Sequence, residues 1–210
     1  PYWQCFSYSG PLHVTISAVL DAINYTDDLF DTEGNPAKRV RWECSCLQAV
    51  CGGCAMIING IPALACNTFV DEVTKTDLVL EPLSKFPVVA DLMVDRSIIY
   101  ENLNSAKAYI EGRSVSSKQN HEHQYSVAKC LKCGLCLEVC PNYNAGGTFF
   151  GAVFANESYL IASQSPKGDS QVIKEYKKHF GANCSKALSC QSVCPVGIET
   201  ITSIVRMNRK

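Results

Sequence analysis

The cysteine run from Cys130 to Pro141 is the stretch whose residue types and spacing point most directly to chemistry. It reads Cys-Leu-Lys-Cys-Gly-Leu-Cys-Leu-Glu-Val-Cys-Pro, the C-x2-C-x2-C-x3-C-P spacing that binds cubane iron–sulfur clusters. Three thiolates two residues apart can surround three corners of one cubane, whereas the fourth starts a helix that points away and serves another cluster. The run therefore predicts a second cysteine set, which is present at Cys184, Cys190 and Cys194-Pro195.

The two cysteine runs are pseudo-repeats. When they are aligned, the second run supplies Cys184, Ala187, Cys190 and Cys194 where the first supplies Cys130, Cys133, Cys136 and Cys140. In two-cluster ferredoxins, the fourth cysteine of each run ligates the cluster of the other run. This rule assigns a [4Fe–4S] cluster to Cys130, Cys133, Cys136 and Cys194, and it leaves Cys140, Cys184 and Cys190 for the other cluster.

The second cluster lacks one protein thiolate, because the methyl side chain of Ala187 cannot ligate iron. A [3Fe–4S] cluster is the natural occupant of such a site, and we expect a near-isotropic EPR signal from its oxidised form. A [4Fe–4S] cluster with a non-cysteine ligand is the alternative. Four-cysteine zinc ribbons use paired C-x2-C knuckles, which the x2, x2, x3 spacing does not match.

A further cysteine set precedes these runs. Cys46, Cys51, Cys54 and Cys66 follow C-x4-C-x2-C-x11-C, and the first three match the plant-type loop that holds a [2Fe–2S] cluster. Gly52 and Gly53 would let the backbone pass close to the inorganic sulfides. The three clusters use eleven of the thirteen cysteines and leave Cys5 and Cys44 over. Cys44 is an alternative to Cys46, but only Cys46 has the x4 spacing.

Composition bounds the class of protein. The 210 residues are 47% hydrophobic, which permits well-filled cores, and the net charge of −1 without a basic stripe argues against nucleic acid as a partner. The cysteine count is odd, the cysteines are closely spaced and no signal peptide is visible, so we expect metal ligation in a reducing compartment rather than disulfides. No apolar run approaches the length of a transmembrane helix.

The first half shows strand and helix patterns around the [2Fe–2S] loop. We expect a strand in the aromatic residues 1–10, a helix over 17–24, a loop over 26–38 and a further strand over 77–81. Residues 56–64 read as a hairpin that turns at Asn59-Gly60 and returns Cys66 to the other ligands. These elements predict a β-grasp ferredoxin domain over residues 1–92, ending where Pro82, Pro87 and the periodicity near Asp91 mark a boundary.

The second half, residues 93–210, is predicted to be an all-α two-cluster ferredoxin domain, so that the fold class is α+β. Helical patterns cover 96–111, 149–162, 170–180 and 200–207. The polar residues 112–125 are interpreted as a surface connection. His121 and His123 within it are interpreted as two exposed loop histidines, with metal ligation as the alternative.

This arrangement closely resembles the iron–sulfur subunits of succinate dehydrogenase and fumarate reductase. The resemblance is carried by Pro1-Tyr-Trp-Gln4, the cysteines from Cys46 to Cys66, the segment Pro82–Asp95 and the seven cysteines of the second half. It implies that an N-terminal strand precedes Pro1. The chain departs from some members at three places: it has Cys54 where they have Asp, Asn144-Ala145 where ubiquinone-using members have a tryptophan pair, and Ser185 where they have His.

The resemblance implies a partner FAD subunit that interconverts succinate and fumarate, since this chain shows no G-x-G-x-x-G fingerprint of its own. Electrons would pass singly in the order FAD, [2Fe–2S], [4Fe–4S], [3Fe–4S] and quinone at a cytochrome b-type membrane anchor. A second hypothesis places the quinone near Pro141, Tyr143, Ser185 and Lys186. The alternative is that these four residues only pack beside the cluster.

The departures from the family pattern favour menaquinone over ubiquinone, with no direct contact between this chain and quinone as the alternative. The family also implies a peripheral position on the cytoplasmic face of a bacterial inner membrane, or on the matrix side in mitochondria. Two other functions remain open: a free-standing polyferredoxin, and a subunit of a heterodisulfide-reductase-like or thiol:fumarate reductase complex. The last would be supported by a CCG-type motif, which the sequence does not contain.

Overall fold

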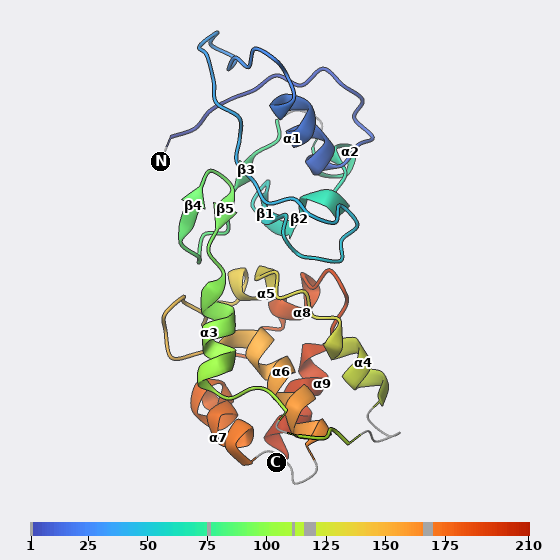
Figure 1. Cartoon of the computed structure of the whole chain (residues 1–210), viewed down its shortest axis with the longest axis vertical. Helices are drawn as coiled ribbons and strands as arrows, with labels where there is room; N and C mark the ends of the chain where they lie inside the picture. Colours follow the sequence, from blue (N-terminus) through green and yellow to red (C-terminus); the bar gives the residue numbers. More distant parts are fainter. Residues whose placement is uncertain (1, 75–76, 111, 116–120, 166–169) are drawn as a thin grey trace. The chain divides into compact units, whose positions relative to one another are not determined.

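The computed structural model describes residues 2–74, 77–110, 112–115, 121–165 and 170–210. The chain forms two compact units, one of Pro1–Leu83 with Val88–Val94 and one of Ser84–Pro87 with Asp95–Lys210 (Figure 1). The first contains short strands with a few helices, and the second is built from helices. The combination of helix and sheet in two parts confirms the coarse α+β prediction, while the β-grasp assignment stays a prediction.

The first unit contains the helix expected over residues 17–24. It is α1 (Ile16–Asn24), and Thr15 caps it by accepting a hydrogen bond from the backbone N–H of Ala18 at 3.3 Å. Ile16, Val19 and Leu20 are at most 4% exposed. Their spacing of three and four residues places them on one face, so burial of that face holds the helix in the unit.

The predicted hairpin is confirmed. Strands β1 (Ala55–Ile58) and β2 (Ile61–Leu64) pair antiparallel, and Asn59 and Gly60 turn between them with φ of 47° and 80°. Strand β3 (Leu80–Glu81) joins the other edge of β1, giving the order β2-β1-β3. Asn59 Oδ1 also accepts a hydrogen bond from the N–H of Val79 at 2.7 Å, which ties the turn to the segment leading into β3.

One strand prediction is wrong, and one hairpin was not predicted. The described residues 2–10 form no strand, and Tyr2 and Trp3 are 85% and 70% exposed. Aromatic content favours a strand only where a sheet edge is available for pairing. In contrast, β4 (Val88–Ala90) and β5 (Met93–Val94) form an unexpected hairpin, so the prediction that residues 93–210 are all-helical fails at 93–94. The short elements η1 (Ala65–Asn67) and α2 (Val70–Val73) complete the first unit.

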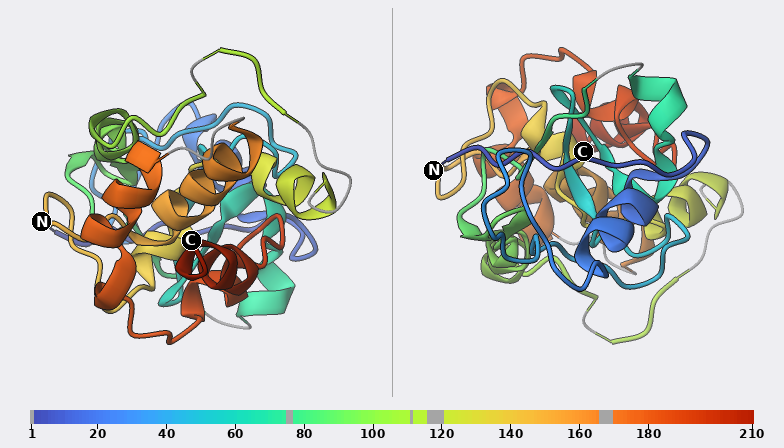
Figure 2. Two further views of the ribbon diagram at one scale, coloured as in Figure 1. Left: turned by 90° about the horizontal axis from the view of Figure 1, so that it is seen from below. Right: turned by 90° about the horizontal axis from the view of Figure 1, so that it is seen from above.

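The second unit is organised around α6 (Gly151–Gln164), in which eleven residues are buried. Helices α3, α4, α5, α7 and α9 all contact it, and Figure 2 shows α7 and α9 beside it. The surrounding elements are α3 (Ser97–Ser105), α4 (His121–Ala128), α5 (Leu135–Glu138), α7 (Ser170–His179), η2 (Gly181–Asn183), α8 (Ser189–Ser192) and α9 (Thr200–Asn208). Helix α6 begins at Gly151, whose φ is +73°, and a Cβ there would lie 2.3 Å from Leu137 Cδ2. Only glycine fits this approach to α5.

The helices predicted over 149–162, 170–180 and 200–207 are confirmed as α6, α7 and α9. The helix predicted over 96–111 ends early, at Ser105, and residue 111 lies outside the described residues. The surface connection predicted over 112–125 is wrong from His121 onward, because α4 begins there. Residues 116–120 of that prediction also lie outside the described residues.

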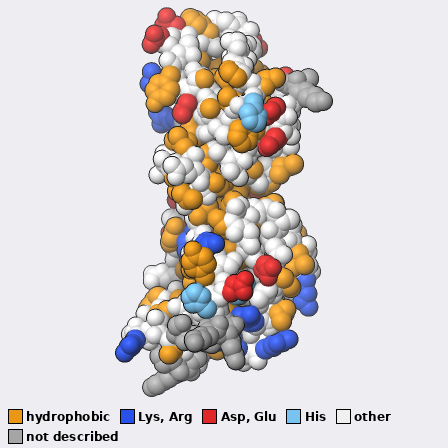
Figure 3. All heavy atoms as spheres, turned by 90° about the vertical axis from the view of Figure 1, so that its right-hand side faces the viewer, with side chains coloured by type: hydrophobic (Ala, Val, Ile, Leu, Met, Phe, Trp, Pro, Cys, Tyr) orange, Lys and Arg blue, Asp and Glu red, His pale blue; other side chains and the backbone are white. Residues whose placement is uncertain are grey.

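Charged side chains of both signs are interspersed with hydrophobic ones on the face shown in Figure 3, in keeping with the near-zero net charge. Among the described residues, no helix is both long and apolar enough to cross a membrane.

Candidate functional site

The loop from Cys46 to Cys54 bends so that backbone N–H groups point at sulfur. Leu47, Ala49 and Gly52 have φ of 53°, 56° and 77°. Cys46 Sγ accepts hydrogen bonds from the N–H groups of Gln48 at 3.3 Å and Val50 at 3.4 Å, and Cys66 Sγ accepts one from Ala49 at 3.3 Å. Backbone amides of one loop thus donate to both Cys46 and Cys66, the first and fourth predicted [2Fe–2S] ligands.

The same donors change the acidity of the loop thiols. The hydrogen bonds from Gln48 and Val50 lower the pKa of Cys46 to about 7, whereas burial raises the pKa of Cys54 to about 12. The pKa of Cys44 is also raised, first by burial and then by the charge of Asp21. Cys46 thus has two backbone amide donors within the loop, which agrees with its prediction as a ligand in preference to Cys44.

The second unit repeats one backbone conformation 54 residues apart. Lys132 and Lys186 have φ of 52° and 59°, and Gly134 and Leu188 have φ of 89° and 59°. A four-residue helix then follows in each copy, α5 and α8. In the second copy the N–H of Lys186 donates to Cys184 Sγ at 3.4 Å, and the N–H of Lys132 acts in the same way on Cys130. The aligned cysteine runs are therefore equivalent in backbone shape as well as in sequence.

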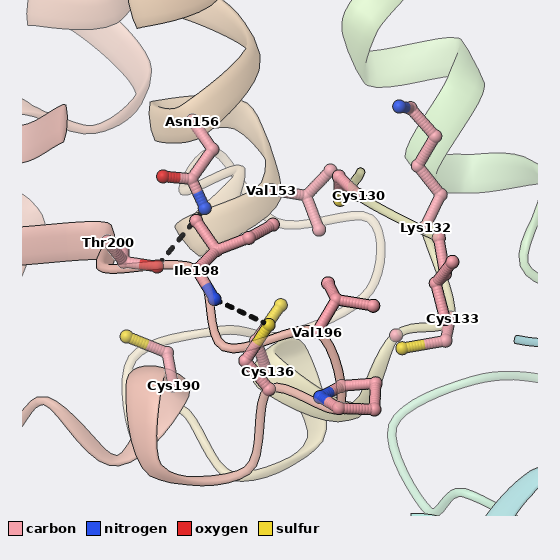
Figure 4. Close-up of a pocket in the computed structure, with 14 residues that line it drawn as sticks. Cys130, Lys132, Cys133, Cys136, Val153, Asn156, Cys190, Val196, Ile198 and Thr200 are labelled. Carbon is pink, nitrogen blue, oxygen red and sulfur yellow. Dashed lines mark hydrogen bonds between the residues drawn. The ribbon is translucent and has the colours of Figure 1, made fainter. Parts of the chain in front are cut away.

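The four predicted [4Fe–4S] ligands line one pocket, shown in Figure 4. Its wall comes from both runs, from α6 and from the start of α9, and it includes Cys130, Cys133, Cys136, Cys190, Cys194, Val153, Asn156, Ile198 and Thr200. Ile198 donates its backbone N–H to Cys194 Sγ at 3.3 Å, and Asn156 Nδ2 donates to Thr200 Oγ1 at 3.1 Å. The pocket therefore brings Cys194 of the second run together with the first run, but Cys190, which the ferredoxin rule assigns to the other cluster, lines it as well.

This pocket suits a group that carries positive charge. Burial raises the pKa of Cys130 to about 11, raises that of Cys133 and raises that of Cys136 well above its usual value. Several thiolates can share such a low-dielectric space only beside cations such as cluster irons. In the described ranges, no group of three or more His, Cys, Asp or Glu side chains closes around a single metal-ion position. The fit to a cluster rests on the amide donors and on the buried thiols.

The remaining three cysteines of the helical unit influence one another. Burial, followed by the charges of Cys140 and Cys184, raises the pKa of Cys190 to about 11. Ala187 stands at the position that corresponds to Cys133, between the two residues with left-handed φ. The structure therefore offers three thiols, with one corner lacking a protein thiolate.

Comparison with known proteins places these cysteine sets in a family. Residues 1–101 match a family described as a 2Fe-2S iron-sulfur cluster binding domain, and residues 126–198 match a 4Fe-4S dicluster domain. The chain is 34% identical over 192 residues to the succinate dehydrogenase iron-sulfur subunit of Bacillus subtilis, covering 85% of this chain and 75% of that protein. The chain belongs to the family of succinate dehydrogenase and fumarate reductase iron–sulfur subunits.

Other relatives agree with this assignment. A fumarate reductase iron-sulfur subunit of Escherichia coli is 30% identical over 209 residues, covering 94% of this chain and 82% of that protein. A chain of the solved Mycobacterium smegmatis Sdh1 complex in the apo form has a similar fold, with a TM-score of 0.76 and 21% identity over 96% of this chain and 87% of that chain. The resemblance seen in the sequence is confirmed, as are the electron-transfer role and the [2Fe–2S] and [4Fe–4S] cluster types.

The residues predicted to lie near a quinone differ in accessibility in this iron–sulfur subunit. Pro141, Ser185 and Lys186 are exposed, whereas Tyr143 is only 3% exposed. The structure thus presents three of the four at the surface and encloses the fourth. The side chain of Tyr143 is buried in the helical unit, unlike the three residues with which it was grouped.

The interpretation of His121 and His123 as exposed loop residues is wrong for one of them. Both lie in α4; His121 is exposed, but His123 is 8% exposed. His123 Nε2 lies 2.9 Å from Ser203 Oγ in a hydrogen bond, and its ring packs at 4.8 Å from that of Tyr159. Burial lowers the pKa of His123, followed by the charge of Arg206. His123 is therefore a core residue of the iron–sulfur subunit.

Sequence reasoning missed charged residues beside the pocket. Lys132 Nζ forms a 2.7 Å ion pair with Glu157 Oε1 on α6, and both side chains are largely buried. Arg96 donates from a guanidinium nitrogen to the carbonyl oxygen of Cys133 at 3.2 Å. The sequence signal for this ion pair was the lysine at position 132 within a cysteine run. Its acidic partner, Glu157, lies 25 residues away and could not be identified from the sequence.

Proposed function

We propose that this subunit carries electrons one at a time between a partner FAD subunit, where succinate and fumarate are interconverted, and a quinone pool at a membrane anchor of the cytochrome b type. Its relatives are named as subunits of succinate dehydrogenase and fumarate reductase, which supports the two partners. We place it peripherally, on the cytoplasmic face of a bacterial inner membrane or the matrix side of a mitochondrial one.

Three clusters are proposed as the relay. Cys46, Cys51, Cys54 and Cys66 would hold a [2Fe–2S] cluster, Cys130, Cys133, Cys136 and Cys194 a [4Fe–4S] cluster, and Cys140, Cys184 and Cys190 a [3Fe–4S] cluster. Such clusters accept and release single electrons, which the two-electron flavin couple requires of its partner. The chain itself supplies amide donors to the sulfurs, and it supplies buried surroundings that limit access of water.

The observation that carries this proposal is the repeated backbone around Ala187. The second run keeps the turn and short helix of the first, but it has a methyl group in place of one thiol. A three-iron cluster needs three protein thiolates, the number that remains. An ordinary pair of four-iron clusters would need a fourth ligand at this corner.

The quinone end is proposed to lie beside the cluster held by Cys140 and Cys184. Pro141, Ser185 and Lys186 are exposed next to these cysteines, so they can contact a ligand brought by an anchor subunit. Menaquinone is preferred over ubiquinone, because residues 144 and 145 are Asn and Ala rather than a tryptophan pair. Tyr143 is left out of this site because it is buried.

The function is tested with Cys190→Ala in the complete complex. In the wild-type complex, about nine irons per chain and a near-isotropic oxidised EPR signal are expected from the three cluster types. The variant should lose that signal and most quinone-linked turnover, while dye-linked oxidation of succinate is partly retained. Cys5→Ala is the matched control, since Cys5 is exposed and outside the ligand sets. Unchanged quinone-linked turnover in Cys190→Ala contradicts the proposed terminal position.

A further inference from the structure

Asn156 and Thr200 form a buried polar pair in the wall of the pocket that the four predicted [4Fe–4S] ligands line. Asn156 lies on α6 and is 3% exposed, and Thr200 is the first residue of α9 and is 2% exposed. Asn156 Nδ2 donates to Thr200 Oγ1 at 3.1 Å, and Figure 4 shows the two side chains pointing toward one another. Two helices thus bring an amide and a hydroxyl together at the edge of the thiol-lined space.

The hydrogen bonds of this pair are incomplete among the described residues. Asn156 Oδ1 is one of three buried side-chain polar atoms there that have no partner. Thr200 Oγ1 accepts the bond from Asn156, and no oxygen of the described chain accepts one from the Thr200 hydroxyl. A buried polar group without a partner costs about 1–3 kcal/mol. Its retention in a native protein therefore indicates a functional reason or a partner from outside the chain.

The bond from Asn156 restricts the direction in which the Thr200 hydroxyl can donate. The amide occupies one lone pair of the hydroxyl oxygen, so the hydroxyl hydrogen points away from Asn156. Beyond this pair, the side chains that line the pocket are those of Leu131, Lys132, Val153, Pro195, Val196, Ile198 and five cysteines. Lysine is only a donor and the aliphatic side chains have no polar atom. Among these described lining residues, sulfur is therefore the only side-chain acceptor.

The same segment of the wall already donates to a cysteine sulfur. The backbone N–H of Ile198, two residues before Thr200, donates to Cys194 Sγ at 3.3 Å. Cys194 is a proposed ligand of the [4Fe–4S] cluster, and Ile198 lines the same pocket as Thr200. The start of α9 thus presents a backbone donor and a hydroxyl side by side in the sequence, and both lie in the wall of a site proposed to hold anionic sulfur.

We propose that the Thr200 O–H donates a hydrogen bond to a sulfur of the [4Fe–4S] cluster, that Asn156 positions this hydroxyl, and that the bond raises the reduction potential of the cluster. The proposal rests on the proposed function and its ligand assignment. Hydrogen bonds to the sulfurs are among the factors that set cluster potentials. They favour the reduced form because it carries more negative charge, and hydrogen bonds to charged acceptors are the stronger ones.

The test uses Thr200→Val in the complete complex, with EPR-monitored redox titration of all three clusters. The change removes the hydroxyl and keeps the branched shape. The [4Fe–4S] midpoint potential should fall by an amount that corresponds to about a tenfold loss in the reduction equilibrium, or about 59 mV for a one-electron couple. Thr200→Ser keeps the hydroxyl and should retain the wild-type potential. Thr202→Val is the matched control, because Thr202 lies in the same helix and its hydroxyl donates to Glu199 Oε2 at 3.2 Å.

Two further variants and one further measurement complete the test. Thr200→Ala covers the case in which Thr200→Val fails to assemble, and it should lower the potential in the same direction. Asn156→Leu leaves the hydroxyl but removes the group that orients it, so a smaller fall is expected. Hyperfine spectroscopy of the reduced cluster in H₂O and D₂O should show one exchangeable proton fewer in Thr200→Val than in the wild type.

The outcomes separate this inference from the proposed function. Intact clusters with an unchanged [4Fe–4S] potential in Thr200→Val and Thr200→Ala overturn the hydrogen bond, and the pair then only joins α6 to α9. An equal fall in Thr200→Ser or Thr202→Val, or a shift confined to the [3Fe–4S] potential, also overturns it. An unchanged potential in Asn156→Leu removes the positioning role of Asn156. Absence of the expected clusters from the wild-type complex contradicts the proposed function itself.

Discussion

Glu138 offers a quantitative test of how the helical unit holds the segment at residues 84–87. It lies on α5 between Cys136 and Cys140 and is 8% exposed. Its Oε1 accepts from Ser84 Oγ at 2.5 Å, and its Oε2 accepts from the backbone N–H of Lys85 at 3.1 Å. The ammonium of Lys85 in turn donates to the carbonyl oxygen of Cys140. A single carboxylate therefore fixes this segment against the helix that joins two proposed cluster ligands.

The perturbation is Glu138→Gln, which retains the shape of the side chain but replaces one acceptor oxygen with an NH₂ group. A hydrogen bond to a charged acceptor contributes about 1.5–3 kcal/mol. Since each 1.4 kcal/mol corresponds to about a factor of ten, local opening around Lys85 should become about 10 to 150 times more populated. Amide hydrogen exchange reports this population directly, without requiring reversible unfolding of a cluster protein.

The assay is hydrogen exchange measured by mass spectrometry on a peptide spanning residues 82–88. Pro82 and Pro87 have no amide hydrogen, so few positions contribute and the Lys85 amide is readily distinguished. Glu101→Gln on α3 is the control, because Glu101 is exposed. An exchange rate in Glu138→Gln within threefold of the wild-type rate refutes the reasoning that this carboxylate anchors the segment.

Two further predictions follow from the helical unit. Burial lowers the pKa of His123 below its usual 6.5. The contribution of His123 to stability is therefore present above pH 6.5 and is lost as the pH falls, at up to about 1.4 kcal/mol per pH unit. His123→Gln should reduce the drop in melting temperature between pH 7 and pH 5, and an equal drop in the variant and the wild type contradicts this. Ala187→Cys should restore the fourth ligand, raise the iron content from about nine to about ten per chain and abolish the three-iron EPR signal, whereas Ala187→Val should do neither.

The features that the sequence predicted well are those defined by local spacing. The hairpin at Asn59-Gly60 and the helices α1, α6, α7 and α9 follow from turn chemistry and periodicity within a few residues. Most candidate ligands also come from short spacings, because successive cysteines within each run are three to six residues apart; Cys66, which lies twelve residues after Cys54, is returned by the hairpin. The exchange of Cys140 and Cys194 between the two runs, in contrast, required a rule about distant residues.

The features that the sequence did not predict depend on distant partners. The polar pattern around His123 concealed a helix, because the hydrogen bond that satisfies its ring comes from Ser203, 80 residues away. The aromatic residues near Trp3 lacked a strand to pair with, so propensity alone gave the wrong element. The burial of Tyr143 depends on Phe86 and Gly151, neither of which is a neighbour in the sequence.

The turn shared by the two cysteine runs bears on how the helical unit arose. A left-handed backbone costs about 1–2 kcal/mol for a residue with a side chain, and the second copy holds both Lys186 and Leu188 in that conformation. If the two runs arose by duplication of one segment, the second run, which has no thiol at position 187, could have changed to a loop without left-handed residues. The second copy has instead kept the strained left-handed conformation at both residues. Natural selection would maintain that conformation if an iron–sulfur cluster still binds at this turn.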